Sequence, residues 1–320
     1  MSDLPKTVQI NEEGPREGFQ IEPGPISTER KIALIDALSD TGLDHIQVAS
    51  FVNPKRVPGW ADADAVVEGF RPRESIRYTA LWLNEKGLER ALSHRDRLHI
   101  DGSISLVASE PFLMRNQQRS LAENARMQRN QIAIFKANGI PVTRISVMAA
   151  FGCNYAGDIT AERVVDTVAS GFEIARDEDL AITDLSLADT MGWATPETIK
   201  RTIGALRERW PDLTLNLHLH DTRGLGIANV YAGLEMGVAS YDSAVAGLGG
   251  CPFAGQRGAA GNVCTEDLVF LCEEMGIRTG VNLEALIEAA RLAEDVVGHP
   301  LPGSLMRGGT LARLRAAPLH

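Results

Sequence analysis

Short runs of β-forming residues alternate along this chain with longer segments of helical periodicity, and this alternation constrains the fold most. It is typical of a parallel sheet whose neighbouring strands are joined by helices. Eight runs have the composition of strands, at residues Thr7–Asn11, His45–Ala49, Ile76–Leu81, Ser103–Val107, Val142–Met148, Ile182–Leu187, Thr214–Leu219 and Ser240–Ala246. Helical segments lie between them, including Ser27–Thr41, Leu121–Asn138, Ala161–Arg176, Pro196–Arg209 and Leu225–Met236. The chain is therefore predicted to have an α/β fold.

The number and spacing of these units favour a closed (β/α)8 TIM barrel over a doubly wound sheet. Eight strand–helix units spaced by about 30–40 residues match one barrel. After the first strand, Glu13–Gly18 offers charged side chains instead of the GxGxxG pattern of a dinucleotide-binding turn. We expect a TIM-barrel catalytic domain over residues 1–285. Residues 286–320 are expected to form a C-terminal helical extension, with a loosely ordered tail packed on the barrel.

Composition excludes several classes of partner. The net charge of −10 argues against nucleic acid, because neutralising phosphates requires a basic face. The apolar runs are shorter than a membrane span requires. The four cysteines have no close metal-binding spacing and no targeting peptide is visible, so they are interpreted as reduced thiols. We expect a cytoplasmic protein with neither a nucleic-acid nor a membrane partner.

The strongest candidate site is Leu217–Asp221, at the end of the seventh predicted strand. Alternate residues of a strand point the same way, so the imidazoles of His218 and His220 project together, about 6–7 Å apart. Two neutral imidazoles can bind one divalent metal ion. Two hydrogen-bonded histidines near a surface are the alternative. The position at the C-terminal end of a barrel strand, where active sites of this fold lie, favours the metal.

Other reactive side chains follow other strands. Arg16 and Glu17 come just after the first strand, where the carboxylate could complete a metal site and the guanidinium could hold an oxyanion. A surface ion pair is the alternative. Asp189 follows the sixth strand, where it could also cap a helix. Gln47 lies on the second strand, either in the active site or as a hydrogen-bonded strand-end amide.

The segment Gly247–Asn262 contains six glycines in sixteen residues, which predicts a mobile lid over the barrel mouth. Cys251 in this lid could approach substrate when the loop closes, although a small buried apolar residue is the alternative. Asn262 at the far end offers an amide oxygen to a hard cation.

Taken together, these residues resemble the 3-hydroxy-3-methylglutaryl-CoA lyase family of the DRE-TIM metallolyases, over about residues 8–295. The resemblance rests on Gly14–Gln20, Ser50–Lys55, Ala188–Gly192, His218–Thr222, Val245–Phe253, Gly261–Asn262 and Thr265–Asp267. It implies a Mg²⁺ or Mn²⁺ ion held by Glu17, His218, His220 and Asn262. It also implies catalytic roles for Arg16, Asp189, His218 and Cys251, and substrate binding by Arg16, Gln20, Gln47 and Ser50. A homodimer is implied because relatives usually form dimers.

The reaction implied by this resemblance is a retro-Claisen cleavage of a 3-hydroxyacyl-CoA. For 3-hydroxy-3-methylglutaryl-CoA the products are acetyl-CoA and acetoacetate. The metal would lower the pKa of the C3 hydroxyl, and Asp189 or His218 would take its proton. Arg16 would neutralise the thioester enolate, and Cys251 would protonate it.

Three departures from the family pattern surround the expected substrate. Glu17 stands where the lyases usually have Asp, and Gln47 stands where they carry Glu. The lid is longer, with Gly255–Gly258 between Ala254 and Ala259. These departures leave open a lyase for another branched 3-hydroxyacyl-CoA, such as citramalyl-CoA. A Claisen-type synthase and a catalytically silent barrel with a binding role are the further alternatives.

Overall fold

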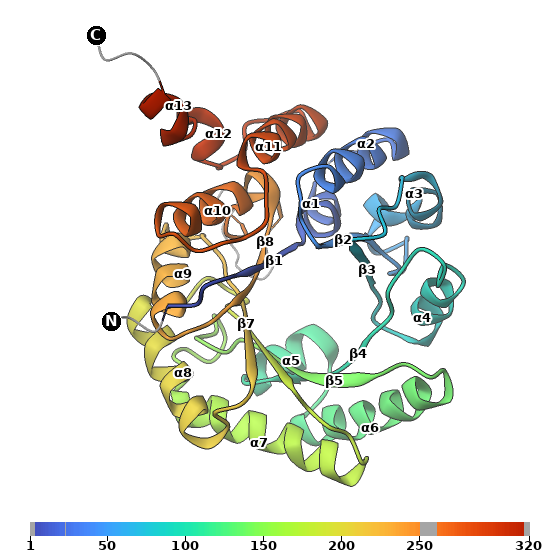
Figure 1. The fold of residues 1–320 in the computed structure, drawn as a ribbon. Helices are drawn as coiled ribbons and strands as arrows, with labels where there is room; N and C mark the ends of the chain where they lie inside the picture. The colour runs from blue at the N-terminus through green and yellow to red at the C-terminus, as the bar shows by residue number, and fades with distance from the viewer. Residues whose placement is uncertain (1–3, 23, 250–260, 317–320) are drawn as a thin grey trace. The chain divides into compact units, whose positions relative to one another are not determined.

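Eight strands alternate with helices in the computed structural model, which describes residues 4–22, 24–249 and 261–316 (Figure 1). The strands are β1 (Gln9–Glu12), β2 (His45–Ser50), β3 (Arg77–Leu81), β4 (Gly102–Val107), β5 (Val142–Met148), β6 (Asp184–Ala188), β7 (Thr214–His218) and β8 (Ser240–Ser243). Their order in the sheet is β3-β2-β1-β8-β7-β6-β5-β4, which is the cyclic order of a (β/α)8 barrel. The predicted fold class is confirmed.

The helices follow the strands in turn. They are α1 (Gly14–Ile21), α2 (Thr28–Ser39), η1 (Pro58–Trp60), α3 (Ala63–Gly69), α4 (Glu85–Leu92), α5 (Glu110–Gln117), α6 (Leu121–Ala137), α7 (Ala161–Asp177), α8 (Pro196–Arg209), α9 (Gly226–Glu235), η2 (Val245–Gly247), α10 (Thr265–Glu274), α11 (Leu283–Val297), α12 (Leu305–Gly308) and α13 (Leu311–Ala316). Helix α11 crosses the boundary that the sequence suggests at residue 285, so that division into domains stays a prediction.

One compact unit of the chain contains residues 101–241. Its strands β4, β5, β6 and β7 pair in parallel, and their apolar side chains, such as Ile145 and Leu185, are fully buried. Helices α6 and α7 lie along these strands (Figure 1). Gly171 allows α7 to approach closely, because a Cβ atom there would lie 2.9 Å from the side chain of Ile145. The strand ends are thus held by a packed layer of helices.

The second compact unit contains the described residues 6–22, 24–100, 242–249 and 261–316. Strands β1, β2 and β3 pair in parallel, and α2 packs against both α3 and α11. The buried side chains of Leu34 and Leu38 form part of the α2 packing face. The segments before residue 101 and after residue 241 therefore share one core, which brings the turn after β1 to the segment around Asn262.

Local sequence signals set the helix ends. Ser27 caps α2 by accepting the N–H of Arg30, and Thr195 caps α8 with Pro196 in the first turn. Among the described residues, no helix is long and apolar enough to cross a membrane. Three cysteines lie among the described residues, and all of them are free and buried: Cys153, Cys264 and Cys272.

Candidate active site

The turn between β1 and α1 positions Arg16 and Glu17. Glu13 is the N-cap residue of α1, and its backbone N–H donates to the carbonyl of Ser243 at the end of β8. Pro15 lies in the first turn, where a missing N–H is tolerated and the fixed φ favours the helix. The indole N–H of Trp60 donates to the carbonyl of Arg16 at 3.0 Å. This corner is therefore held from two sides.

The guanidinium of Arg16 contacts three side chains. Its Nη1 donates to Glu17 Oε1 at 2.9 Å, its Nη2 donates to Glu13 Oε2 at 2.5 Å, and its Nε donates to Gln47 Oε1. Burial lowers the pKa of Arg16, but the negative charges of Glu17 and Glu13 more than offset this and keep it above its ordinary value. Arg16 therefore provides a permanent, fixed positive charge, and the predicted Arg16–Glu17 pair lies in a partly buried site.

Glu17 contacts Asn262 through its second oxygen. Asn262 Nδ2 donates to Glu17 Oε2 and to the carbonyl of Leu248. Gly249 makes this approach possible, because its φ is +83° and a Cβ atom would lie 2.8 Å from Glu17 Cβ. Asn262 is 2% exposed, and no group in the described ranges hydrogen-bonds to its Oδ1. A buried amide oxygen beside a carboxylate is a suitable ligand for a hard cation.

The two histidines project from the end of β7, as the alternation in the sequence predicts. Their ring centroids are 5.1 Å apart, with the rings nearly perpendicular. His220 Nδ1 lies 2.5 Å from the carbonyl oxygen of Asp189. A proton on Nδ1 is shared with this carbonyl, which leaves the Nε2 lone pair as the ligand. This is the hydrogen-bonding pattern of a metal-binding histidine.

Asp189 follows β6 and is 1% exposed. Its Oδ1 accepts the backbone N–H groups of Trp193 at 2.7 Å and of Ala194 at 3.1 Å. Its Oδ2 is buried, and nothing in the described part of the chain hydrogen-bonds to it. Burial raises the pKa of Asp189 to about 6, although the two N–H donors and the charges of His218 and Arg223 lower it. One oxygen of this carboxyl group thus orients the side chain, and the other is available to accept a proton.

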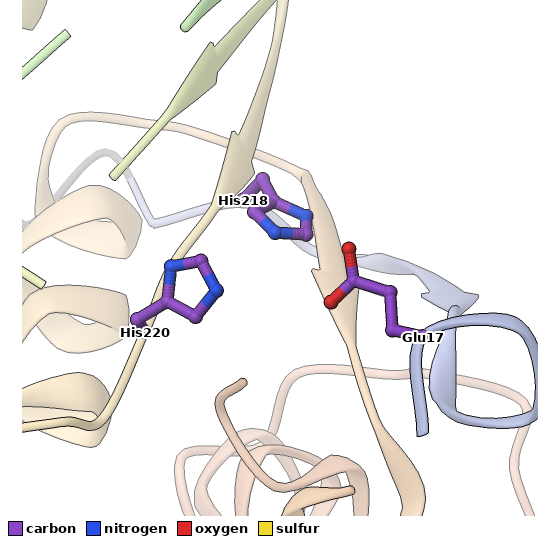
Figure 2. Close-up of side chains that lie close together, drawn as sticks. All are labelled: Glu17, His218 and His220. Carbon is purple, nitrogen blue, oxygen red and sulfur yellow. The ribbon is translucent and has the colours of Figure 1, made fainter. Parts of the chain in front are cut away.

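Figure 2 shows Glu17, His218 and His220, whose ligand atoms all lie within 4.8 Å of one another. One carboxylate and two imidazoles form a mixed oxygen and nitrogen set that suits a divalent cation. Asn262, whose Nδ2 donates to Glu17, would add a fourth ligand through its Oδ1, which has no partner among the described residues. The residues present therefore fit a metal site.

The remaining predicted residues divide into three groups. Gln47 contacts Arg16, as described above. Gln20 Oε1 and Ser50 Oγ are buried, and neither finds a hydrogen-bond partner among the residues that the structure describes. Both are therefore available to a polar ligand. Cys251 and most of the predicted lid lie outside the described residues.

Two acidic residues that the sequence interpretation overlooked hold this corner together. Glu12 is fully buried, and it accepts the N–H groups of Gly14 and Val245 and the hydroxyl of Thr265. Burial raises the pKa of Glu12 to about 8, although these donors lower it. Glu13 binds Arg16. In the sequence, the one sign of a role for Glu12 and Glu13 is that two adjacent acids stand at the end of a strand. Their binding partners lie in later segments and in the helix itself, so local sequence does not reveal them.

Comparison with known proteins gives consistent matches over most of the chain. A family model described as HMGL-like matches residues 7–293. A hydroxymethylglutaryl-CoA lyase from Bacillus subtilis is 40% identical over 300 residues, which are 93% of this chain and 96% of that protein.

A second relative and a solved structure extend this match. A Pseudomonas aeruginosa protein named 3-hydroxy-3-isohexenylglutaryl-CoA/hydroxymethylglutaryl-CoA lyase is 38% identical and covers 92% of this chain and 95% of its own length. The structure of an HMG-CoA lyase from Acinetobacter baumannii, in complex with coenzyme A and 3-methylmalate, has a TM-score of 0.83 and is 34% identical. It covers 98% of this chain and 97% of that chain.

Proposed function

Because the chain belongs to the HMGL-like family, we propose that it is a carbon–carbon lyase that cleaves 3-hydroxy-3-methylglutaryl-CoA to acetyl-CoA and acetoacetate. The observation that carries this proposal is the 40% identity to a hydroxymethylglutaryl-CoA lyase over nearly the whole of both chains. The residues at the ends of β1, β6 and β7 supply the charges and the proton acceptor that this cleavage requires.

The metal ligands in this proposal are Glu17, His218, His220 and Asn262, with Mg²⁺ or Mn²⁺ as the ion. Such an ion would supply Lewis-acid polarisation of the substrate hydroxyl and carboxylate oxygens. The carbonyl of Asp189 orients His220, and the amide of Asn262 orients Glu17. Outer contacts of this kind fix the direction of metal ligands.

Asp189 acts as the general base. Its Oδ2 accepts the proton of the C3 hydroxyl, the C2–C3 bond breaks, and the electron pair moves into the thioester as an enolate. The support is geometric, since Oδ1 is occupied by two backbone N–H groups and Oδ2 faces no donor from the described residues. His218 is the competing base.

Arg16 balances the negative charge of the enolate. A fixed, permanently charged guanidinium lowers the energy of a charge that develops only in the transition state. The enolate then takes a proton at C2 to give acetyl-CoA, and Cys251 is the proposed acid. Gln20, Gln47 and Ser50 bind the polar groups of the acyl chain, which the buried open oxygens of Gln20 and Ser50 favour.

A lyase for a different branched 3-hydroxyacyl-CoA is the second candidate. It is favoured by the Pseudomonas aeruginosa relative, whose name includes a longer branched substrate. Gln47 and Glu17 also lie where substrate is expected to bind. A cytoplasmic location and a homodimer stay predictions from the sequence.

The decisive experiment measures acetyl-CoA release from a panel of thioesters with added Mg²⁺ or Mn²⁺. The panel contains 3-hydroxy-3-methylglutaryl-CoA, citramalyl-CoA and 3-hydroxy-3-isohexenylglutaryl-CoA. We expect the first compound to give the highest kcat/KM. Faster cleavage of another member would replace the named substrate and keep the reaction type. No cleavage of any member, with no metal bound by the purified protein, would favour a silent barrel.

A further inference from the structure

Glu13 is an acidic N-cap residue whose side chain does not cap its helix. An Asp, Asn, Ser or Thr at this position normally accepts an N–H from the first turn. Here α1 has no side-chain cap, and the carboxylate of Glu13 instead lies 2.5 Å from Arg16 Nη2. The side chain of Glu13 is only 7% exposed. A carboxylate is thus withdrawn from water and directed at one specific cation.

The backbone around Glu13 is fixed at both ends. Its N–H donates to the carbonyl of Ser243 at 2.8 Å, and its carbonyl accepts the N–H of Glu17 at 2.9 Å. The contact with Arg16 spans three residues within the first turn of α1, so it needs no long flexible reach. Little conformational freedom remains to be lost when the guanidinium binds, and Glu13 is therefore well suited to orient it.

The three partners of Arg16 differ in charge. Gln47 is neutral, while Glu13 and Glu17 are carboxylates. In the proposed site Glu17 would also bind a divalent ion, which would take up much of its negative charge. Glu13 is then the partner that keeps a full negative charge for Arg16 once the ion is bound.

We propose that Glu13 is a positioning residue that binds Arg16 Nη2 and so limits the contact between the guanidinium and the metal ligand Glu17 to Nη1. This inference rests on the proposed function, because Arg16 is the group that meets the enolate. Without Glu13, Nη2 also becomes available to Glu17, and the guanidinium then competes more strongly with the metal for this carboxylate than through Nη1 alone. The neutral side chain of Gln47 cannot replace the lost charge, although its oxygen already contacts Arg16 Nε.

The test compares Glu13→Gln, Gln47→Glu and the double variant Glu13→Gln/Gln47→Glu, each for steady-state kinetics and for Mn²⁺ affinity by paramagnetic resonance titration. Glu22→Gln is the matched control, since it removes a carboxylate at the other end of α1 that pairs with His299 and not with Arg16.

For Glu13→Gln we expect kcat to fall by about 10- to 100-fold, as for a misplaced catalytic group, with KM changed by less than about threefold. Mn²⁺ affinity should fall as well. Adding Glu13→Gln to Gln47→Glu should cost much less kcat and Mn²⁺ affinity than adding it to the unaltered protein. The reason is that the carboxylate at position 47 then binds the guanidinium in place of Glu13. Glu22→Gln should leave both quantities unchanged.

The proposal would be overturned if Glu13→Gln caused the same loss in the Gln47→Glu background as in the unaltered protein. A purely structural role of Glu13 would not be rescued by a charge at position 47. Unchanged kcat and Mn²⁺ affinity in Glu13→Gln would also overturn it. If the unaltered protein cleaves no thioester of the panel, the proposed function fails on its own. The Mn²⁺ titrations of the same four variants still decide whether Glu13 limits the contact of Arg16 with Glu17.

Discussion

Glu12 at the end of β1 and Asp189 just after β6 are both buried carboxyl groups, and burial raises the pKa of each, yet their oxygens are used differently. Both oxygens of Glu12 are hydrogen-bonded, Oε1 to two backbone N–H groups and Oε2 to the Thr265 hydroxyl. Only Oδ1 of Asp189 is bonded, and its Oδ2 has no partner within the described ranges.

The difference supports the proposal that Asp189 is a chemical group, while Glu12 is a structural one. A buried polar atom without a partner costs about 1–3 kcal/mol, so a fold retains one where it serves a ligand or a reaction. A raised pKa alone does not make this distinction, since the pKa is about 8 for Glu12 and about 6 for Asp189. The two groups differ instead at the second carboxyl oxygen, which accepts the Thr265 hydroxyl in Glu12 and has no partner among the described residues in Asp189.

The largest expected effect is in the variant Asp189→Asn. The amide oxygen keeps the N–H donors of Trp193 and Ala194, but the group can no longer accept a proton. We expect kcat to fall by about 10²–10⁴-fold, the usual contribution of a general base, with an unchanged melting temperature. Steady-state kinetics and thermal unfolding measure both. Retention of more than a tenth of the activity would assign the proton transfer to another group, with His218 first.

Arg16→Met and His218→Ala come next. Each removes one group that stabilises charge or holds the metal, and we expect losses in kcat/KM of about 10²–10³-fold while the protein stays folded. Circular dichroism checks the fold, and the acetyl-CoA assay checks the rate. A variant of either kind that retained more than half its activity would remove that residue from the mechanism.

Thr265→Val would leave Oε2 of Glu12 without a hydrogen-bond donor, which is the situation of Oδ2 in Asp189. The valine has nearly the same shape as threonine, so packing is retained while the 2.6 Å hydrogen bond to Glu12 is lost. We expect the free energy of unfolding to fall by about 1–3 kcal/mol. Urea denaturation measures this. A change close to zero would mean that hydrogen bonding does not distinguish the two carboxyl groups.

The smallest expected effect is the pH dependence carried by Glu12. Its pKa rises from 4.5 to about 8 on folding, so the native state binds the proton more tightly than the unfolded state. The stability that Glu12 contributes is therefore full below pH 4.5 and is lost as the pH rises toward 8. Glu12→Gln mimics the protonated group and should flatten the fall in melting temperature over this range. An equally steep fall in the variant would exclude Glu12 as its source.

Much of the fold is readable from the sequence, because strand and helix periodicities are local properties. Strand β5 and helix α8 have the bounds that the sequence predicts. The pair His218 and His220 follows from alternation along a strand. In contrast, the short helix α1 contains Gly14 and Gly18 and is not predicted, since long-range contacts of these glycines help to fix it.

The end of β8 shows why the rest was not predictable. The sequence predicts a strand to Ala246, but β8 ends at Ser243 and Ala246 has a φ of +57°. Carboxylate oxygens of Glu12 and Glu266 accept the N–H groups of Val245 and Ala246 and hold this turn. One of these acids is 233 residues away in the chain, so no window of local sequence contains the cause.

The bond between Glu12 and Thr265 also sets an order of events while the chain is being made. The two residues are 253 positions apart, and at about 5–20 residues per second a ribosome needs roughly 13–50 s to add the second after the first. During this delay Glu12 stays hydrated and ionised at the end of an unfinished strand. The hydrogen bond that holds the end of β1 to Thr265 can therefore form only after the first 265 residues have been added.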